Sequence, residues 1–311
     1  MSSLWASAVN SVPRARSTES SARLRSVAET LATEAAGFVR RRRAEVFGAD
    51  AGPSNGPPSG AVRSKTTPTD PVTVVDTETE QLLRDRLAHL RPGDPILGEE
   101  GGGPAYAGDL GARSSRPANA VTWVLDPIDG TVNFVYGIPA YAVSVGAQIN
   151  GVSVAGAVAD VVAGRVYSAA AGLGAHVVDE HGTGPLRCAA VDDLSMALLG
   201  TGFGYSRRRR ATQAALLAHL LPVVRDVRRI GSAALDLCMV AAGRLDAFYE
   251  HGLERWDCAA GALIAAEAGA RVSLPSRYGS GAGLVVAAAP GIADELWSAL
   301  QRFNGLDPIL D

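Results

Sequence analysis

A twelve-residue stretch, Trp123–Phe134, places two carboxylates directly after a predicted buried strand. Residues 121–125 are β-branched and apolar, which is typical of such a strand. Asp126 and Asp129 follow, and a Gly-Thr pair then begins a run that can open a helix. Backbone N–H groups at a helix start favour an anion. Because carboxylates alone would repel a phosphate, the pattern predicts cations between the two and therefore a magnesium-dependent phosphatase site.

A single Asp-x-x-Asp-Gly after a strand is also typical of a plain turn. The whole of residues 123–134, however, resembles the signature of the inositol monophosphatase family, W-x-x-D-P-[IL]-D-G-T-x-N-F, at every signature position. Three further segments resemble motifs of that family in the same order: Lys65–Asp76 (K-x-x-P-x-D-x-V-T-x-x-D), Gly98–Glu100 (G-E-E) and Trp256–Gly261 (W-D-x-A-[AG]-[GA]). By this resemblance, the chain is identified as a member of the family.

The composition of the 311 residues narrows the classes of protein to consider. Hydrophobic residues make up 47% and charged residues 20%, which is typical of a soluble globular protein. A net charge of −3 argues against nucleic acid or an acidic membrane as a partner, and no apolar run is long enough to span a membrane. The three cysteines lack C-x-x-C spacing, which indicates buried thiols in a reducing cytoplasm. The five histidines lack ligand spacing and are expected at the surface.

The periodicity of the apolar residues changes along the chain. Residues 1–20 are predicted to be a disordered tail, and helical spacing begins at about residue 22 and continues to about 47. Residues 21–190 are predicted to form an N-terminal α+β domain whose mainly antiparallel sheet carries most of the metal ligands. Residues 191–311, where strands and helices alternate, are predicted to form a C-terminal α/β domain that completes the active site. The Gly-rich residues 101–119 are predicted to be a mobile flap.

These patterns predict an α+β or α/β protein with two sheets sandwiched by helices. The family resemblance implies the specific arrangement, a five-layer αβαβα sandwich of the sugar-phosphatase type with helices between and outside the two sheets. The predicted strands are 121–125, 140–149, 152–159, 165–169 and 173–178 in the first sheet, and 196–199, 223–230, 244–250, 270–274 and 283–289 in the second.

The resemblance also implies a set of metal ligands. Glu99, Asp126 and the backbone carbonyl of Ile128 would hold a first ion, while Asp126, Asp129 and Asp257 would hold a second. All of these ligands are oxygen atoms, which suits Mg²⁺, or Mn²⁺ in its place, rather than zinc. Two such ions can clamp the attacking and leaving oxygens of a phosphoryl transfer. The resemblance also allows for a third ion that binds more weakly.

Catalytic and substrate-binding roles follow from the same resemblance. Glu99 and the hydroxyl of Thr131 would orient the attacking water. Asp76 would hydrogen-bond Thr131 or help to bind the third ion. The amides of Gly130 and Thr131 would hold the phosphate. The other implied substrate contacts are Asp129, Ala233, Glu250 and Asp257.

Several of these residues have a structural alternative. An Asp before a helical run can cap the helix, which applies to Asp76 and Asp257. For Asp76 both roles stay open, whereas the signature around Asp257 favours the metal. An isolated pair such as Glu99 and Glu100 is typical of solvated loop carboxylates, and Glu250 at a strand end is also typical of a surface residue.

The resemblance implies hydrolysis of inositol-1-phosphate by a homodimeric, lithium-sensitive cytoplasmic enzyme. Relatives of the family act on other phosphate monoesters, so fructose-1,6-bisphosphate, histidinol phosphate and 3′-phosphoadenosine-5′-phosphate are alternative substrates. A different class of function is also open, because some bacterial relatives contact the transcription machinery.

Overall fold

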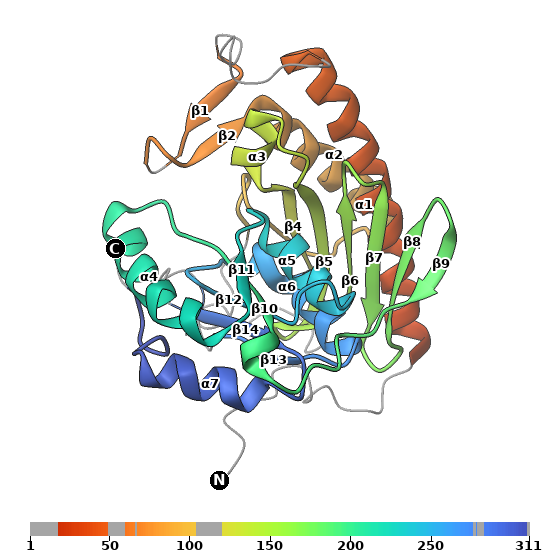
Figure 1. Cartoon of the computed structure of the whole chain (residues 1–311). Coiled ribbons are helices and arrows are strands. Elements are labelled where there is room, and N and C mark those ends of the chain that lie inside the picture. The colour runs from red at the N-terminus through yellow and green to blue at the C-terminus, as the bar shows by residue number, and fades with distance from the viewer. Residues whose placement is uncertain are drawn as a thin grey trace.

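The computed structural model describes residues 18–48, 60–65, 67–103, 120–275, 278 and 283–309. Five layers succeed one another across the molecule: outer helices, a seven-stranded sheet, two central helices, a five-stranded sheet and a second pair of outer helices (Figure 1). This confirms the predicted αβαβα arrangement. None of the helices that the structure describes is long and apolar enough to cross a membrane.

The first outer layer consists of α1 (Thr18–Phe47) and α2 (Val74–Leu90), which cover one face of the seven-stranded sheet (Figure 1). Apolar residues of α1 recur at helical spacing, and those from Leu24 to Val39 are buried against the sheet. The sheet order is β3-β4-β5-β6-β7-β8-β9, and every pair except β3–β4 is antiparallel. The strands are β3 (Ile96–Gly98), β4 (Val121–Asp129), β5 (Ala142–Ile149), β6 (Val152–Asp160), β7 (Arg165–Ala170), β8 (Ala175–Asp179) and β9 (Gly182–Pro185).

The central layer is formed by α5 (Ala233–Ala241) and α6 (Arg255–Glu267), which are rich in small residues. Helix α6 contacts β5, β6 and β7 on one side and β13 and β14 on the other. A Cβ atom at Gly156 of β6 would lie 2.9 Å from both Cα and Cβ of Ala260. The missing side chain therefore allows α6 to pack directly on the sheet that carries two of the acidic residues.

Replacing Gly156 by Ala should lower the free energy of unfolding by about 1–3 kcal/mol, the usual cost of overpacking a tight core. The atoms that the new methyl group meets belong to the backbone and Cβ of a helix, so they cannot move aside as a flexible side chain would. Gly184→Ala on β9 is the matched control, because a Cβ there meets nothing within 4 Å. Denaturant unfolding measures both variants; equal stability of Gly156→Ala and the wild type would contradict this packing.

The five-stranded sheet has the order β11-β10-β12-β14-β13, parallel between β11, β10 and β12 and antiparallel beyond. Helices α4 (Arg207–Leu220) and α7 (Ala293–Arg302) form the outer layer on its far side, where Leu216, Leu220, Leu296 and Leu300 are buried (Figure 1). The strands are β10 (Leu198–Thr201), β11 (Asp226–Arg228), β12 (Ala247–His251), β13 (Arg271–Ser273) and β14 (Leu284–Ala288).

Smaller elements complete the chain and bear on the predicted tail. Strands β1 (Val62–Ser64) and β2 (Pro71–Thr73) form a separate antiparallel pair, and α3 (Thr131–Tyr136) follows β4. Helix α1 begins at Thr18, so the last residues of the predicted tail 1–20 are helical; residues 1–17 lie outside the described residues. Residues 104–119 of the predicted flap also lie outside them. The domain boundary at residue 190 stays a prediction.

One expectation about the histidines is wrong, because His251 at the end of β12 is only 1% exposed. Its Nε2–H donates to the carbonyl of Gly305 at 2.8 Å, and its Nδ1 has no hydrogen-bond partner among the described residues. Burial, together with the charge of Arg209, lowers the pKa of His251 to about 4, although the hydrogen bond to Gly305 acts in the opposite direction. The ring therefore links the second sheet to the segment after α7 in its neutral form.

This histidine should make the fold less stable in mild acid. In the unfolded chain His251 takes up a proton below its ordinary pKa of 6.5, whereas in the folded chain it does so only near 4, so stability falls as the pH drops from 6.5 towards 4. Between pH 7.5 and pH 5 the loss is about 2 kcal/mol. Urea unfolding of the wild type and of His251→Gln at the two pH values measures how much His251 contributes to the pH dependence of the free energy of unfolding. Identical pH dependence in the two proteins would contradict a neutral buried ring.

Candidate active site

Three carboxylates converge where the first sheet meets the central helices. Asp126 and Asp129 lie at the end of β4, and Asp257 lies in the first turn of α6. One carboxylate oxygen from each lies within 4.8 Å of the other two. The pairing of β4 with β5 shifts register between Asp126 and Asp129, and this irregularity accompanies the sharp turn that brings both carboxylates to one place. The two signatures of the sequence therefore meet in space.

The electrostatics of this cluster are unfavourable without a counter-charge. Burial raises the pKa of Asp126 well above its usual value, and the neighbouring charges of Glu99, Asp129 and Asp257 raise it further. Burial likewise raises the pKa of Asp257 well above its usual value and that of Asp129 to about 6. Asp126 is 1% exposed, and its Oδ1 has no hydrogen-bond partner among the described residues. Such groups are retained where a cation or a substrate compensates them.

Two of the three carboxylates are held in place by backbone and hydroxyl donors. Oδ2 of Asp129 accepts hydrogen bonds from the Ser232 hydroxyl and the Ala234 amide, both at 2.6 Å. Oδ2 of Asp257 accepts one from the Glu254 amide at 2.6 Å. Glu254 is the N-cap of α6 and Asp257 stands three residues later, so the alternative that Asp257 itself is the N-cap is wrong. These hydrogen bonds fix the orientation of the two carboxylates.

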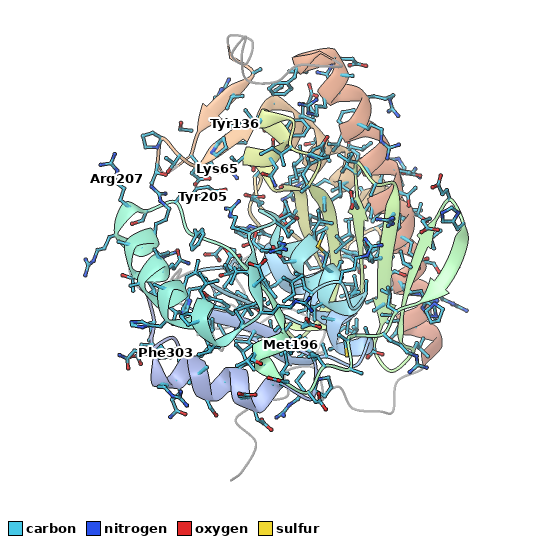
Figure 2. All side chains as sticks on the ribbon, in the orientation of Figure 1. Lys65, Tyr136, Met196, Tyr205, Arg207 and Phe303 are labelled. Carbon is cyan, nitrogen blue, oxygen red and sulfur yellow. The ribbon has the colours of Figure 1, made fainter. Side chains whose placement is uncertain are left out.

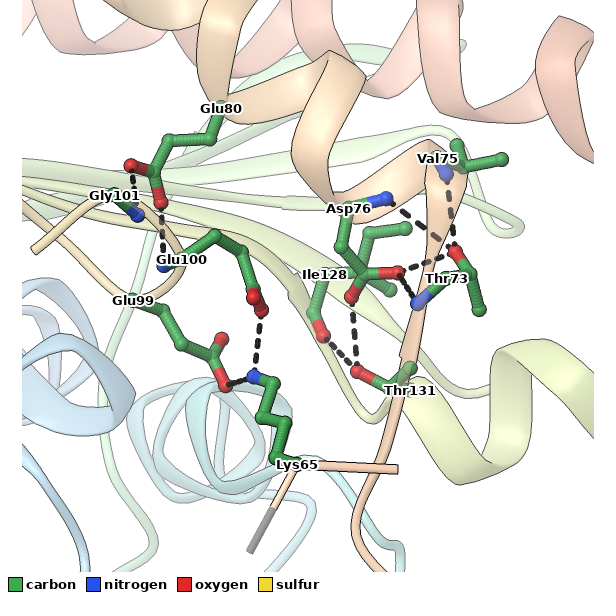
Figure 3. A network of polar contacts seen from close by, with 10 residues as sticks. All are labelled: Lys65, Thr73, Val75, Asp76, Glu80, Glu99, Glu100, Gly101, Ile128 and Thr131. Carbon is green, nitrogen blue, oxygen red and sulfur yellow. Dashed lines mark hydrogen bonds and ion pairs between the residues drawn. The ribbon is translucent and has the colours of Figure 1, made fainter. Parts of the chain in front are cut away.

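Asp76 and Thr131 form a buried pair beside this cluster (Figure 3). The Thr131 hydroxyl lies 3.1 Å from Oδ1 of Asp76 and 3.0 Å from the carbonyl oxygen of Ile128. The other oxygen of Asp76 accepts from the amide and hydroxyl of Thr73, which is the N-cap of α2. Asp76 therefore both completes a capping box and contacts Thr131, so the cap and this hydrogen bond coexist. Burial raises the pKa of Asp76 to about 7.

Glu99 and Glu100 lie in the turn after β3, and both pair with one lysine (Figure 3). Nζ of Lys65 lies 2.6 Å from Oε1 of Glu99 and 2.6 Å from Oε1 of Glu100. Burial raises the pKa of Glu99, and the ammonium group of Lys65 opposes that effect. The two glutamates are therefore not freely solvated. Glu99 stands outside the group of three converging aspartates but interacts with Asp126.

The residues expected to contact the substrate lie around the same centre. Gly130 joins β4 to α3 with a φ of 94°, and a Cβ there would lie 3.0 Å from the Ala140 carbonyl oxygen, so this tight turn requires glycine. Ala233 is the first residue of α5, next to the Ser232 that holds Asp129. Glu250 on β12 is partly buried, and burial raises its pKa to about 8.

Two loops from distant parts of the chain meet near the site. The Thr69 hydroxyl, in the loop after Lys65, donates to the Tyr205 carbonyl at 3.0 Å, and Figure 2 labels Lys65 and Tyr205 on these loops. Burial raises the pKa of the Tyr205 phenol, and the negative charges of Asp70, Glu99 and Asp129 raise it further. The sequence did not predict a role for Tyr205, which directly follows the Gly-x-Gly-x-Gly run that ends at Gly204. The hydrogen bond between Thr69 and Tyr205, which are 136 residues apart in the sequence, shows that Tyr205 lies near the site.

The donor set fits a divalent cation that prefers oxygen. Three carboxylates lie within mutual reach, one oxygen of Asp126 has no hydrogen-bond partner among the residues described, and the mutual repulsion of the group calls for positive charge. No thiol or imidazole belongs to this group. Carboxylate and carbonyl ligands of this kind suit Mg²⁺ and Mn²⁺.

Known proteins are similar to this chain in both sequence and fold. The profile of the inositol monophosphatase family matches residues 21–305. An inositol-1-monophosphatase of Mycobacterium leprae is 78% identical over 290 residues, which are 93% of this chain and 97% of the relative. A Nus factor SuhB of Pasteurella multocida is 37% identical over 75% of this chain and 83% of its own. The solved structure of Mycobacterium tuberculosis SuhB has a TM-score of 0.75 and 68% identity, covering 92% of this chain and 98% of that one.

The matches span both sheets, the central helices and all four sequence motifs. The aspartates that converge in space belong to the segments that carried the resemblance. The chain therefore belongs to the inositol monophosphatase family and is a phosphatase that hydrolyses phosphate monoesters.

Proposed function

We propose that this phosphatase hydrolyses inositol-1-phosphate to inositol and phosphate with Mg²⁺ as its cofactor. The observation that carries the proposal is the convergence of Asp126, Asp129 and Asp257, whose oxygens lie within 4.8 Å of one another. The names of relatives with 74–78% identity support the substrate. Mn²⁺ is expected to substitute for Mg²⁺, because it accepts the same oxygen ligands.

The ligands divide between two ions in this proposal. Glu99, Asp126 and the Ile128 carbonyl hold one, and Asp126, Asp129 and Asp257 hold the other, with a weaker third ion near Asp76. When bound, the ions neutralise the charge of the phosphate and lower the pKa of water. Glu99 would release Lys65, its partner at 2.6 Å, to accept an ion.

The chain's own residues position the reactants. The Thr131 hydroxyl, held between Asp76 and the Ile128 carbonyl, orients the attacking water together with Glu99. The amides of Gly130 and Thr131 face the phosphate. Asp129 and Asp257 contact the substrate. Ala233 and Glu250 face the polyol, whose hydroxyl groups need acceptors such as a carboxylate.

The test is phosphate release from inositol-1-phosphate, fructose-1,6-bisphosphate, histidinol phosphate and 3′-phosphoadenosine-5′-phosphate, each with Mg²⁺ and with lithium added. We expect the highest kcat/KM for inositol-1-phosphate and inhibition of that reaction by lithium. A strong preference for another ester would keep the chemistry and overturn the substrate.

Relatives named Nus factor SuhB support a second proposal, that the chain also binds the transcription machinery. The substitution Asp126→Asn separates the two, because it removes a metal ligand inside the protein and leaves the surface unchanged.

We also propose a homodimer and a cytoplasmic location. The three cysteines form no disulfide, which is consistent with a reducing compartment.

A further inference from the structure

Helix α2 carries a second buried carboxylate one turn after Asp76. Glu80 is 2% exposed, and its two oxygens accept hydrogen bonds from the amides of Glu100 at 2.7 Å and Gly101 at 2.8 Å (Figure 3). These donors belong to the turn that carries Glu99. No proposed catalytic or metal-binding role uses Glu80.

Arg84, one further turn along α2, extends this contact. Its Nε donates to Oε1 of Glu80 at 2.8 Å, and its Nη2 donates to the carbonyl of Gly102 at 2.6 Å. The two side chains together hold the backbone of three consecutive residues, 100–102. We call Glu80 and Arg84 the α2 bracket. Bonds of this kind, between charged side chains and backbone groups, are stronger than those between neutral partners.

The backbone of the turn packs closely against the α2 bracket. A Cβ at Gly98 would lie 2.4 Å from Cδ of Glu80, and one at Gly101 would lie 2.6 Å from its Oε1. The backbone of the turn therefore lies directly on the carboxylate. This contact explains why glycine stands on both sides of the Glu99-Glu100 pair.

The turn is fixed on its other side by the first sheet. The Glu99 amide donates to the carbonyl of Leu125 at 3.2 Å, the residue before Asp126. The Glu99 side chain reaches Lys65 and the carboxyl of Asp126 rather than Glu80. The α2 bracket thus sets the position of the Glu99 backbone relative to the three aspartates without touching the reacting groups.

We propose that Glu80, with Arg84, is a positioning residue that holds Glu99 in place to bind a divalent cation, an inference that rests on the proposed function. Groups that orient a metal ligand in this way typically account for a 10- to 100-fold change in metal affinity. Together with Asp76, which contacts Thr131, Glu80 makes α2 the element that aligns two parts of the site.

Calorimetric titration of the metal-stripped protein with Mn²⁺, without substrate, tests this role. Glu80→Gln leaves one acceptor oxygen and turns an NH₂ group towards an amide, so we expect its affinity for the ion to fall about 10- to 100-fold. The matched control is Glu78→Gln on the same helix, because Glu78 pairs with Arg42 at 2.8 Å on the outer surface. The control should bind Mn²⁺ as the wild type does.

Amide hydrogen exchange in the metal-free protein gives a second readout. The amides of Glu100 and Gly101 should lose protection in Glu80→Gln and keep it in Glu78→Gln, while the amides of the first sheet stay protected in both. Arg84→Gln, at a residue whose side chain is 26% exposed, should weaken Mn²⁺ binding in the same direction if Glu80→Gln does not fold.

The results of these experiments distinguish the positioning role of Glu80, the α2 bracket and the proposed function. Unchanged Mn²⁺ affinity in a folded Glu80→Gln variant would overturn the positioning role, even if the two amides lost protection. Unchanged protection of Glu100 and Gly101 would overturn the α2 bracket itself. A wild-type protein that bound no Mn²⁺ or Mg²⁺ would instead overturn the proposed function, and the role of Glu80 in metal binding with it.

Discussion

Replacing Asp126 by Asn should lower kcat by about 1,000-fold or more, since a metal clamp contributes several kcal/mol to the transition state. The same change should stabilise the metal-free fold by about 1–2 kcal/mol, as is common when strain at an active site is relieved. Asp126 is buried, and its pKa is raised by that burial and by Glu99, Asp129 and Asp257. An amide keeps the shape and removes the charge.

Phosphate release and thermal unfolding measure the two halves of this result. The control is Asp85→Asn on α2, where the carboxylate is exposed and accepts a hydrogen bond from Gln81 at 2.8 Å. That variant should match the wild type in both measurements. Retained turnover in Asp126→Asn would remove this residue from the metal site, whereas lower stability would show that the carboxylate has a structural partner.

Replacing Thr131 by Val should lower kcat about 100-fold or more while changing KM little, because a misplaced reactant can cost about 10²-fold in rate. The hydroxyl group lies between Asp76 and the Ile128 carbonyl, at 3.1 and 3.0 Å, and valine has the same shape without it. Steady-state kinetics at saturating Mg²⁺ measures the effect.

Thr131→Ser serves as the matched variant, since it keeps the hydroxyl group and removes only a methyl group. It should retain at least a tenth of the wild-type kcat. If valine and serine lowered kcat equally, the methyl group and its packing would matter, and the hydroxyl group would have no part in orienting water.

Part of the site could be predicted from local order, because Asp126 and Asp129 directly follow a buried strand. The place of Asp257 beside them came from the family resemblance, and the structure brings the three carboxylates together. The strand and helix periods likewise predicted most elements within a few residues. The five-layer arrangement came from the resemblance rather than from these periods.

Features that depend on tertiary contacts could not be predicted in the same way. His251 is buried and bonds the Gly305 carbonyl, which is 54 positions away in the sequence. Asp76 and Asp257 were expected as possible N-caps, but each occupies position N3 of its helix, three residues after the N-cap. In sequence, a carboxylate at N3 is easily mistaken for an N-cap, because both stand at the start of a helix. Glu80 lies four residues after Asp76 on one helix face, a signal that becomes meaningful only once the turn at Glu100 is known.

The most direct measurement is phosphate release from inositol-1-phosphate by protein stripped of metal with a chelator, before and after Mg²⁺ is added. The convergence of Asp126, Asp129 and Asp257 predicts negligible release in the stripped protein and full recovery with Mg²⁺. Undiminished release from the stripped protein would contradict the account, because the three carboxylates would then have a role other than holding the ions.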